Sequence, residues 1–349
     1  MKLNDLLNHT SEWLKGTGPN SDIVISSRIR LARNLDKASF PHWADSKQSQ
    51  ATSDQIQQAI AKVDYLKTTA VFKLSEMDSL DKQFLIERHL MSYEHAQKSD
   101  SKAVAIDEEE VVSVMINEED HIRMQVMQSG FNLFEAWSII NRIDDALSKE
   151  LKFAFSQEWG YLTACPTNVG TGMRGSVMLH LPALVMTRQI DKVLAAISKL
   201  SFTTRGLYGE GTKASGNFFQ ISNQGSLGHG EDEIISNINS LIRQIIAQEN
   251  QARETMLLRN KALIEDRVYR SFGILKNAHI ISSQETAELL SIMRLGLDLG
   301  MIKEIDRRSI NELFIVTQPA HLQKLEGKRL SSQERDVKRA DIIRSRLKI

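Results

Sequence analysis

The stretch CPTNVGTGMR, residues 165–174, is the most informative part of this chain. It brings the chain's one cysteine, a glycine-rich turn and an arginine close together. Apolar residues then alternate with others from Val177 to Leu181, which is typical of a strand with one buried face. The same alternation predicts that Arg174 lies on the opposite, polar face of that strand.

A second informative stretch is NEEDH, residues 117–121, in which three carboxylates follow one another. The apolar and β-branched residues at 111–116 and the alternating apolar residues at 122–126 predict the two strands of a hairpin. The carboxylates would lie at its tip. A solvated acidic turn has the same composition, so the role of this turn depends on what lies beside it.

Arginines occur at predicted strand or loop positions in separate segments of the chain: Arg28, Arg30, Arg123, Arg174 and Arg205. Residues 22–30 follow a Gly/Pro break and predict a strand whose period of two puts Arg28 and Arg30 on one face. The planar guanidinium group binds phosphate oxygens through two parallel hydrogen bonds, so five such groups on one sheet would hold a triphosphate. Taken singly, each arginine also fits an ordinary solvated surface position.

The chain has no phosphate-binding loop of the pattern GxxxxGK[ST]. Gly170, Gly172 and Gly175 match the pattern GxGxxG, with an acid, Asp191, near the usual offset. A dinucleotide-binding fold requires a strand before these glycines and a helix that begins at them. Because a strand is predicted after the glycines instead, we expect side chains to hold any nucleotide.

The order of the predicted elements indicates an α+β fold followed by helices. Helical spacing covers residues 53–95 and 131–151, and a further strand is expected at 218–222. From Glu231 onward an apolar stripe with almost no Gly or Pro predicts a long helix, and helices continue to the end. We expect a short N-terminal extension, a domain with an antiparallel sheet flanked by helices, and an all-α C-terminal domain: residues 1–20, 21–248 and 249–349.

The composition limits the classes of partner. Lys and Arg number 44, as do Asp and Glu, so no global charge attracts the chain to nucleic acid or to a membrane surface. One cysteine excludes an internal disulfide framework and a zinc ribbon. The first residues lack the apolar core of a signal peptide, and no apolar run approaches membrane-spanning length. We expect a cytoplasmic protein.

With these motifs the chain resembles the phosphagen (guanidino) kinases, and most closely the bacterial protein-arginine kinases of the McsB type. The resemblance implies ATP-dependent phosphorylation of arginine side chains in proteins, with Mg²⁺ accompanying ATP. It implies that six residues bind the nucleotide: Ser27, Arg28, Arg30, Arg123, Arg174 and Arg205. It also implies three catalytic residues: Glu119, Glu210 and Cys165.

The chemistry of the acceptor gives these residues their expected roles. A guanidinium group has a pKa above roughly 12 and is a poor nucleophile until it loses a proton. Glu119 and Glu210 would orient this group and accept the proton, with Glu210 on a glycine-flanked loop that closes over the site. Cys165, as a thiolate, would help to hold the acceptor's charge. No dedicated metal ligand is expected, although Glu118 and Asp120 would hold waters of a phosphate-bound Mg²⁺.

The sequence RDVKRA, residues 335–340, lies in the last predicted helix. Arg335 and Arg339 are one helical turn apart, with Asp336 beside them, and Ser331 with Glu334 has the spacing of a capping box. An exposed basic helix face would look the same in sequence. The stretch is similar to the RDxxRA motif with which McsB-type kinases bind phosphoarginine, and the resemblance implies that role here.

The chain departs from ordinary phosphagen kinases in three respects. Only residues 1–20 precede the first arginine motif, where those enzymes carry a helical domain that helps to select a small metabolite. Arg174-Gly175-Ser176 replaces the usual Arg-Ala-Ser, and Met178 stands where a histidine is common. The open acceptor site favours protein arginines. Two alternatives remain: a kinase of free arginine or another small guanidino compound, and a pseudoenzyme adaptor that binds phosphoarginine.

The resemblance also implies partners. Substrates would include a heat-shock repressor and misfolded proteins that a Clp ATPase and protease then degrade in a stress response. A zinc-finger activator of the McsA kind and assembly into a homodimer or a higher oligomer are expected on the same ground.

Overall fold

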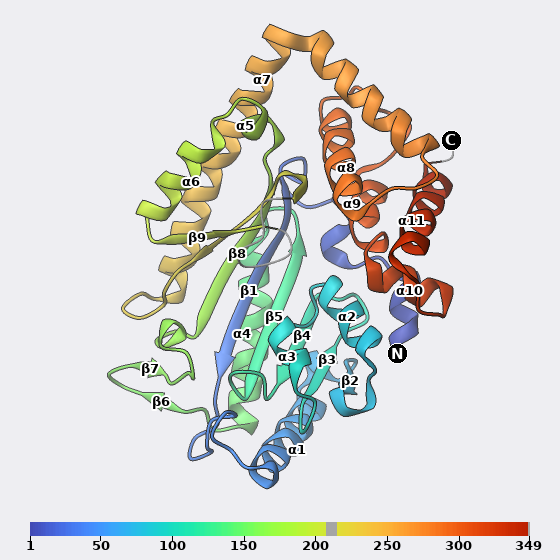
Figure 1. Ribbon diagram of the computed structural model, residues 1–349. Helices are drawn as coiled ribbons and strands as arrows, with labels where there is room; N and C mark the ends of the chain where they lie inside the picture. Colours follow the sequence, from blue (N-terminus) through green and yellow to red (C-terminus); the bar gives the residue numbers. More distant parts are fainter. Residues whose placement is uncertain (207–214, 348–349) are drawn as a thin grey trace.

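The computed structural model of the chain describes residues 1–206 and 215–347. At its centre is an eight-stranded sheet in the order β2-β3-β4-β5-β1-β8-β10-β9, and every pair of neighbours in it is antiparallel (Figure 1). The strands of this sheet are β1 (Val24–Arg33), β2 (Ala70–Lys73), β3 (Ala103–Ile106), β4 (Val112–Ile116), β5 (Ile122–Ser129), β8 (Met173–His180), β9 (Phe202–Arg205) and β10 (Phe218–Asn223). A separate hairpin pairs β6 (Phe155–Ser156) with β7 (Gly160–Tyr161).

Helices cover the sheet and make up the C-terminal part. The α-helices are α1 (Ser46–Lys62), α2 (Ser79–Glu87), α3 (Tyr93–Gln97), α4 (Leu133–Glu150), α5 (Pro182–Met186), α6 (Ile190–Lys199), α7 (Glu231–Asn277), α8 (Ser283–Asp298), α9 (Arg307–Val316), α10 (Pro319–Glu326) and α11 (Ser332–Arg346). Short 3₁₀ turns include η5 (Pro166–Asn168) and η6 (Ser215–Asn217).

One face of the sheet is apolar and lies under α4 and α7. Ile29 and Leu31 of β1 are fully buried on this face, and the strand's period of two turns Arg28 and Arg30 to the other face. Gly175 of β8 lies against α7, where an added Cβ would approach Cδ1 of Ile238 to 2.6 Å. The glycine that replaces the family's usual alanine therefore makes room for α7 to pack closely.

On the other face, Trp13 lies over β1 and β5 beside Arg28, and helices cover the end formed by β3 and β4. Val104 of β3 and Met115 of β4 pack there against Phe84 and Leu85 of α2 and against Ala320 of α10, in a second apolar cluster. This cluster leaves the middle of the same face, on β5, β1 and β8, free for polar side chains. The sheet therefore has a core face and a functional face.

The long helix α7 joins the two parts of the molecule. Figure 1 shows it running from the side of the sheet, across the top, to the C-terminal helices α8–α11. Asn260 interrupts its regular geometry with φ −142° and ψ 39°. The predicted boundary at residue 248 lies within this helix, so the independence of the two parts as folding units stays a prediction. Nowhere in the described chain is a helix long and apolar enough to cross a membrane.

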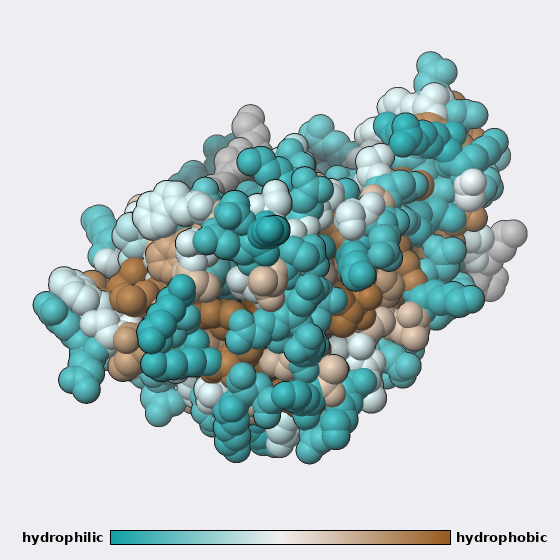
Figure 2. Space-filling model, turned by 90° about the horizontal axis from the view of Figure 1, so that it is seen from below, coloured by the Kyte–Doolittle hydropathy of each residue, from teal (hydrophilic) through white to brown (hydrophobic). Residues whose placement is uncertain are grey.

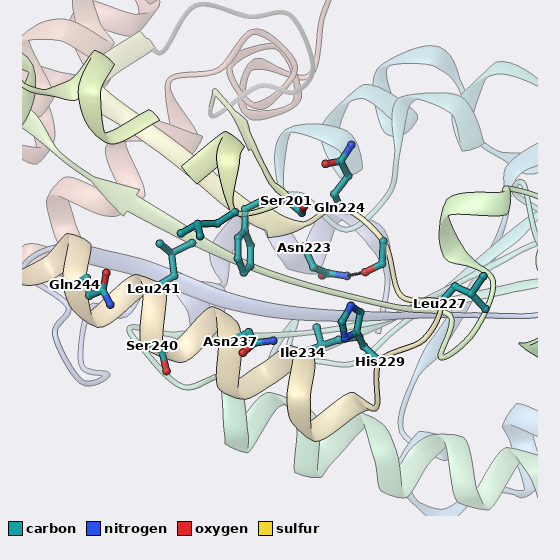
Figure 3. A pocket seen from close by; sticks show the side chains of 13 residues that line it. Ser201, Asn223, Gln224, Leu227, His229, Ile234, Asn237, Ser240, Leu241 and Gln244 are labelled. Carbon is teal, nitrogen blue, oxygen red and sulfur yellow. Dashed lines mark hydrogen bonds between the residues drawn. The ribbon is translucent and has the colours of Figure 1, made fainter. Parts of the chain in front are cut away.

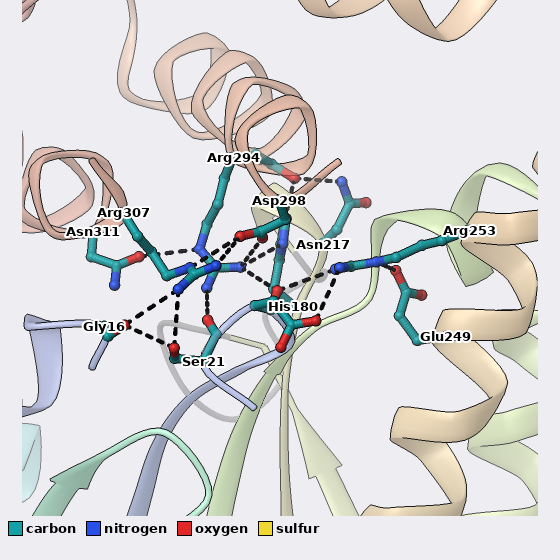
Figure 4. A network of polar contacts seen from close by, with 12 residues as sticks. Gly16, Ser21, His180, Asn217, Glu249, Arg253, Arg294, Asp298, Arg307 and Asn311 are labelled. Atoms are coloured by element: carbon teal, nitrogen blue, oxygen red, sulfur yellow. Dashed lines mark hydrogen bonds and ion pairs between the residues drawn. The ribbon is translucent and has the colours of Figure 1, made fainter. Parts of the chain in front are cut away.

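A buried polar network holds the C-terminal helices against the sheet (Figure 4). Arg294 of α8 donates to the carbonyls of Ser21 and Asp22 and to Nδ1 of His180 at the end of β8. Burial, and then the charges of Arg294 and Arg253, lower the pKa of His180 well below its usual value, so the ring is neutral. Its Nε2 therefore carries the proton and donates to Ser291 Oγ over 2.8 Å.

The predicted fold class is confirmed, although several strands were missed. The helical pattern predicted for residues 53–95 is interrupted by β2, and β3, β9 and the β6–β7 hairpin were not predicted. The capping box at Ser331 and Glu334 is present, and Ser282 caps α8 by accepting from the backbone N–H of Glu285.

Arg294→Met tests the buried network. Arg294 and Asp298 form an ion pair with fully buried side chains, and removal of one partner leaves a buried charge short of compensation. We expect the free energy of unfolding to fall by about 3–5 kcal/mol in chemical denaturation. Arg270→Met is the matched control, because Arg270 and Asp266 form an exposed pair one helical turn apart on α7, where such a pair contributes about 0.3–0.5 kcal/mol. Equal effects of the two substitutions would contradict this account.

Candidate active site

The functional face of the sheet carries a cluster of arginines. The β1–β8 register places Arg30 directly opposite Arg174, and the β1–β5 register places Arg123 opposite Ala32. Arg205, at the end of β9, pairs with Gln220 of β10. A cavity of about 560 Å³ opens here, and its lining brings together most of the predicted site: Arg30, Arg123, Arg174, Arg205, Glu118, Glu119 and Cys165.

The arginines are held in place by neutral hydroxyl groups. Arg174 donates to Ser222 Oγ and to Thr203 Oγ1 over 2.9–3.2 Å, from neighbouring strands of the sheet. Arg28 donates to Ser176 Oγ over 3.3 Å and lies in a small adjoining cavity of about 20 Å³, beside Met178. Hydroxyl acceptors fix the direction of a guanidinium without cancelling its charge. Ser176, Ser222 and Thr203 therefore orient these two arginines.

Burial and mutual repulsion make the cations costly to hold together. Burial, and then the charges of Arg123, Arg174 and Arg205, lower the pKa of Arg28 to about 9. Burial lowers the pKa of Arg30 well below its usual value, and the neighbouring arginines add to this effect. Nε of Arg30 is buried and has no hydrogen-bond partner among the described residues. A polyanion such as the phosphates of ATP would relieve both the repulsion and the unpaired donor.

The acidic turn lies at one side of the cavity, at the tip of the β4–β5 hairpin. Burial disfavours the charged form of Glu118, but Arg123 beside it and a hydrogen bond from Ser92 hold the pKa of Glu118 at about 2. Nη1 of Arg123 lies 2.6 Å from each carboxylate oxygen of Glu118. Glu118 is therefore ionised and positions Arg123.

Glu119 is the accessible carboxylate of this turn. It is exposed and lines the cavity, and partial burial together with the charges of Asp120 and Glu118 raises its pKa. A higher pKa makes a carboxylate a better proton acceptor at neutral pH. The geometry thus agrees with the role predicted for Glu119.

Asp120 is buried outside the lining of the cavity, so its position does not support its predicted role as a holder of metal-bound water. Its Oδ1 accepts from Asn34 Nδ2 over 2.6 Å and from the backbone N–H of Ala164 over 2.7 Å. These bonds fix the loop that carries Cys165 against the acidic turn. Cys165 is partly exposed, lines the cavity and has its Sγ 3.0 Å from Thr167 Oγ1.

Ser27 and Glu210 are the remaining predicted residues of the catalytic part. Ser27 is fully buried on the opposite face of β1 from Arg28 and Arg30; its Oγ donates to the carbonyl of Gly130 and accepts from the N–H of Asn132. It anchors the start of α4, so its predicted contact with ATP is not supported. Glu210 lies outside the described residues.

The C-terminal motif is divided between the surface and the interior. Arg339 is fully buried and donates to the carbonyls of Thr317 and Ile281 and to Asp336. Arg335 is partly exposed and donates to the carbonyl of Leu330 over 2.9 Å. The two arginines therefore do not form one exposed basic face. Arg339 orients Asp336, which lines a surface cavity of about 660 Å³ beside α11.

A different cavity, of about 650 Å³, lies between α7 and the ends of β9 and β10 (Figure 3). Leu241, Phe202 and Asn237 are among its lining residues, and arginines are absent from the lining in the described part of the chain. Phe202 alternates along β9 with Thr203, whose side chain contacts Arg174. The cavity thus lies on the core side of the sheet, away from the arginine cluster.

Sequence reasoning missed residues that support the site rather than line it. Asn34 donates to Asp120 and accepts from the N–H of His121, and Ser92 donates to Glu118. Ser222 and Thr203 hold Arg174. Their partners are distant in sequence, so no local pattern indicates them.

The comparisons with known proteins agree with this geometry. The model of the family described as "ATP:guanido phosphotransferase, C-terminal catalytic domain" matches residues 51–252, and the "Protein-arginine kinase McsB C-terminal domain" matches residues 261–349. A protein-arginine kinase of Halothermothrix orenii is 49% identical over 348 residues, 99% of each chain. One from a Geobacillus species is 48% identical and covers 97% of this chain and 94% of its own. The chain belongs to the ATP:guanido phosphotransferase family, within it to the protein-arginine kinases.

Solved structures show the same catalytic fold. Lombricine kinase matches 72% of this chain and 77% of its own with a TM-score of 0.61 and 26% identity. The duplicated taurocyamine kinase of Schistosoma mansoni, solved with transition-state analogue components, covers 72% of this chain and 35% of its own with a TM-score of 0.62 and 25% identity. The predicted resemblance and the predicted class of enzyme, an ATP-using kinase that phosphorylates arginine, are confirmed.

Arg30→Met tests the charge balance of the cluster. Removal of one buried cation from among like charges should raise the thermal stability of the nucleotide-free protein. The same change should remove most of the stabilisation by ATP, which for the wild type is about 2.7 kcal/mol at a ligand concentration of 100 times Kd. Thermal unfolding with and without ATP measures both effects. Arg142→Met, at an exposed position on α4, is the control. If ATP stabilises Arg30→Met as much as the wild type, Arg30 lies outside the nucleotide site.

Proposed function

We propose that this chain transfers the γ-phosphoryl group of ATP to the guanidinium group of arginine side chains in proteins. The observation that supports the proposal most strongly is the single cavity that combines Arg30, Arg123 and Arg174 with Glu119 and Cys165. It offers cations for a polyphosphate on one side and an accessible carboxylate for a guanidinium on the other. Family membership gives the reaction its class.

The chain's residues have distinct roles in the proposed transfer. The arginines of the cavity, with Arg28 beside them, bind the phosphates and compensate the charge on the phosphoryl oxygens during transfer. Glu119 and Glu210 hold the guanidinium, and Glu119 accepts the proton that the attacking nitrogen loses. The new bond joins this nitrogen to phosphorus, the bond from phosphorus to the bridging oxygen breaks, and ADP leaves. By resemblance, Cys165 helps to hold the guanidinium and forms no covalent bond.

Mg²⁺ would be held chiefly by phosphate oxygens, and it would supply further charge compensation. Glu118, which is ionised beside Arg123 and lines the cavity, would hold its water. Among the described residues no group of three or more His, Cys, Asp or Glu side chains offers a metal site.

The remaining expectations about cellular role belong to the same proposal. By resemblance, the marked proteins would be degraded by a Clp ATPase and protease in the cytoplasm during stress, and one substrate would be a heat-shock repressor. A zinc-finger activator and a homodimer or higher oligomer are proposed on the same ground. We also propose that residues 21–248 form the catalytic domain and 249–349 the phosphoarginine-binding domain.

Glu119→Gln tests the proposed reaction. The wild type should transfer acid-labile phosphate from ATP to an unfolded protein, and the substitution should slow transfer by about 10²–10⁴ with ATP binding kept. Because the pKa of Glu119 is raised, the rate should fall on acidification at a pH above the ordinary glutamate value of 4.5, and Gln should remove this limb of the profile. Phosphate on free arginine but not on protein would support a small-guanidino kinase, and no transfer to either would support an adaptor.

The C-terminal motif gives a prediction with two separable effects. Arg335 is partly exposed, so Arg335→Ala should weaken phosphoarginine binding at least tenfold through loss of a charge-assisted contact, with little change in stability. Arg339 is buried among carbonyl groups, so Arg339→Ala should also lower the stability of the fold. Calorimetry with phosphoarginine and phosphoserine, together with denaturation, distinguishes the two. Equal affinity of the wild type for both ligands would refute a specific site.

A further inference from the structure

Exposed aromatic side chains gather at the end of the sheet where β1 ends and the acidic turn lies. The first group is on the loop before α1: Trp43 is 75% exposed, although its ring stacks on Phe40 at 6.0 Å and lies 4.5 Å from His42. A single exposed apolar residue is ordinary, whereas several exposed apolar groups near one another can mark a site of contact with another molecule. Figure 2 views the molecule from the α1 end and shows apolar patches set into a hydrophilic surface.

The second group is on the β6–β7 hairpin. Phe155 is 59% exposed and Trp159 48% exposed. The base of this hairpin is rigid: Tyr161 packs edge-on against Phe155 at 5.2 Å, and the guanidinium of Arg33 lies 3.5 Å from the centre of the Tyr161 ring. We call Trp43, Phe155 and Trp159 the aromatic rim.

Hydrogen bonds connect the loops next to the aromatic rim to the acidic turn from both sides. His121, next to the turn, accepts from the N–H of Leu35 at Nδ1 over 3.1 Å, so its Nε2 carries the proton and donates to the carbonyl of Ser39 over 2.9 Å. This bond fixes the loop that leads to Trp43. Asn34 donates both to Asp120 and to the carbonyl of Leu162, which directly follows β7.

Figure 1 shows the end of β1, the loop before α1 and the β6–β7 hairpin at one end of the sheet. The segments that carry the rim therefore lie at the end of the molecule where the acidic turn lies, beside the cavity that Glu119 and Cys165 line and where the acceptor arginine would bind. These segments are fixed relative to Glu119 by the bonds of Asn34, Asp120 and His121. A polypeptide whose arginine enters the cavity must lay its neighbouring residues across this end of the molecule.

We propose that the aromatic rim binds apolar residues that flank the acceptor arginine in an extended, unfolded polypeptide, and so selects such segments as substrates. The inference rests on the proposed function, because it concerns the chain to which the acceptor arginine belongs. Trp and Phe offer large contact areas at low cost in side-chain entropy, which suits the recognition of many apolar sequences. A folded protein buries its apolar residues and presents its arginines among polar neighbours, so it would gain little from this surface.

The position of the rim at the same end of the molecule as the acceptor site favours a substrate polypeptide over a second copy of this chain as the occupant. A free amino acid has no flanking residues to reach the rim. The rim therefore makes the length and the apolarity of the acceptor's surroundings matter, while the cavity itself recognises the guanidinium.

Two peptides of equal length, each with one central arginine, test the proposal. In the apolar peptide the flanking residues are Leu and Phe, and in the polar peptide they are Ser and Gly. The wild type should phosphorylate the apolar peptide with a kcat/KM about tenfold higher. The variant Trp43→Ser, Phe155→Ser, Trp159→Ser should lose this preference and keep its rate on the polar peptide and its KM for ATP. The control, Tyr269→Ser with Leu258→Ser, removes exposed apolar groups from α7 and should keep the preference.

The outcomes separate this inference from the proposed function. Equal rates of the wild type on both peptides, or an unchanged preference in the rim variant, would overturn the inference and leave arginine phosphorylation standing. Transfer to neither peptide nor to any unfolded protein would overturn the proposed function itself. Denaturation midpoints verify that the variants fold. Two separate variants, Trp43→Ser alone and Phe155→Ser combined with Trp159→Ser, show how much each side of the rim contributes to the preference.

Discussion

The site depends on holding several guanidinium cations close together on one face of a sheet. Each of them loses hydration and repels its neighbours, as the lowered pKa values of Arg28 and Arg30 record. If a carboxylate paired with every arginine, the repulsion would vanish, and so would the affinity for a polyanion. The chain instead directs Arg174 and Arg28 with hydroxyl groups and pairs Arg123 with a carboxylate, Glu118. The arginines still repel one another, and a triphosphate can relieve that repulsion.

This requirement also explains the apolar face beneath. The arginines are rigid because β1, in the middle of the sheet, is fixed by Ile29 and Leu31 under the helices that cover that face. Close packing makes the sheet resist movement, so the electrostatic repulsion is absorbed by the core and does not open the site. Gly175 has the same function, since it lets α7 approach the strand that carries Arg174.

Local patterns in the sequence were sufficient where one strand's alternation decides the outcome. They predicted that Arg28, Arg30 and Arg174 face away from the core, and that the acidic residues lie in a hairpin turn. The same alternation places Ser27 on the core face, so here the period of the strand was the better guide than the motif. The roles of Asp120 and Arg339 were not accessible, because their partners Ala164, Ile281 and Thr317 are set by the tertiary fold. Strands as short as β2 and β9 carry too few residues to show a period.

The proposed acceptor site and the proposed C-terminal site have opposite charge requirements, and the reaction itself converts a ligand of one into a ligand of the other. An unmodified arginine is a cation and suits Glu119. Phosphorylation adds nearly two negative charges at neutral pH, so the product is repelled by the acidic turn and attracted to guanidinium groups such as that of Arg335. Release from the catalytic site is thus favoured by the carboxylate that binds the substrate. A marked protein can then bind the same molecule through its new charge, with the buried Arg294 network keeping the two parts in one body.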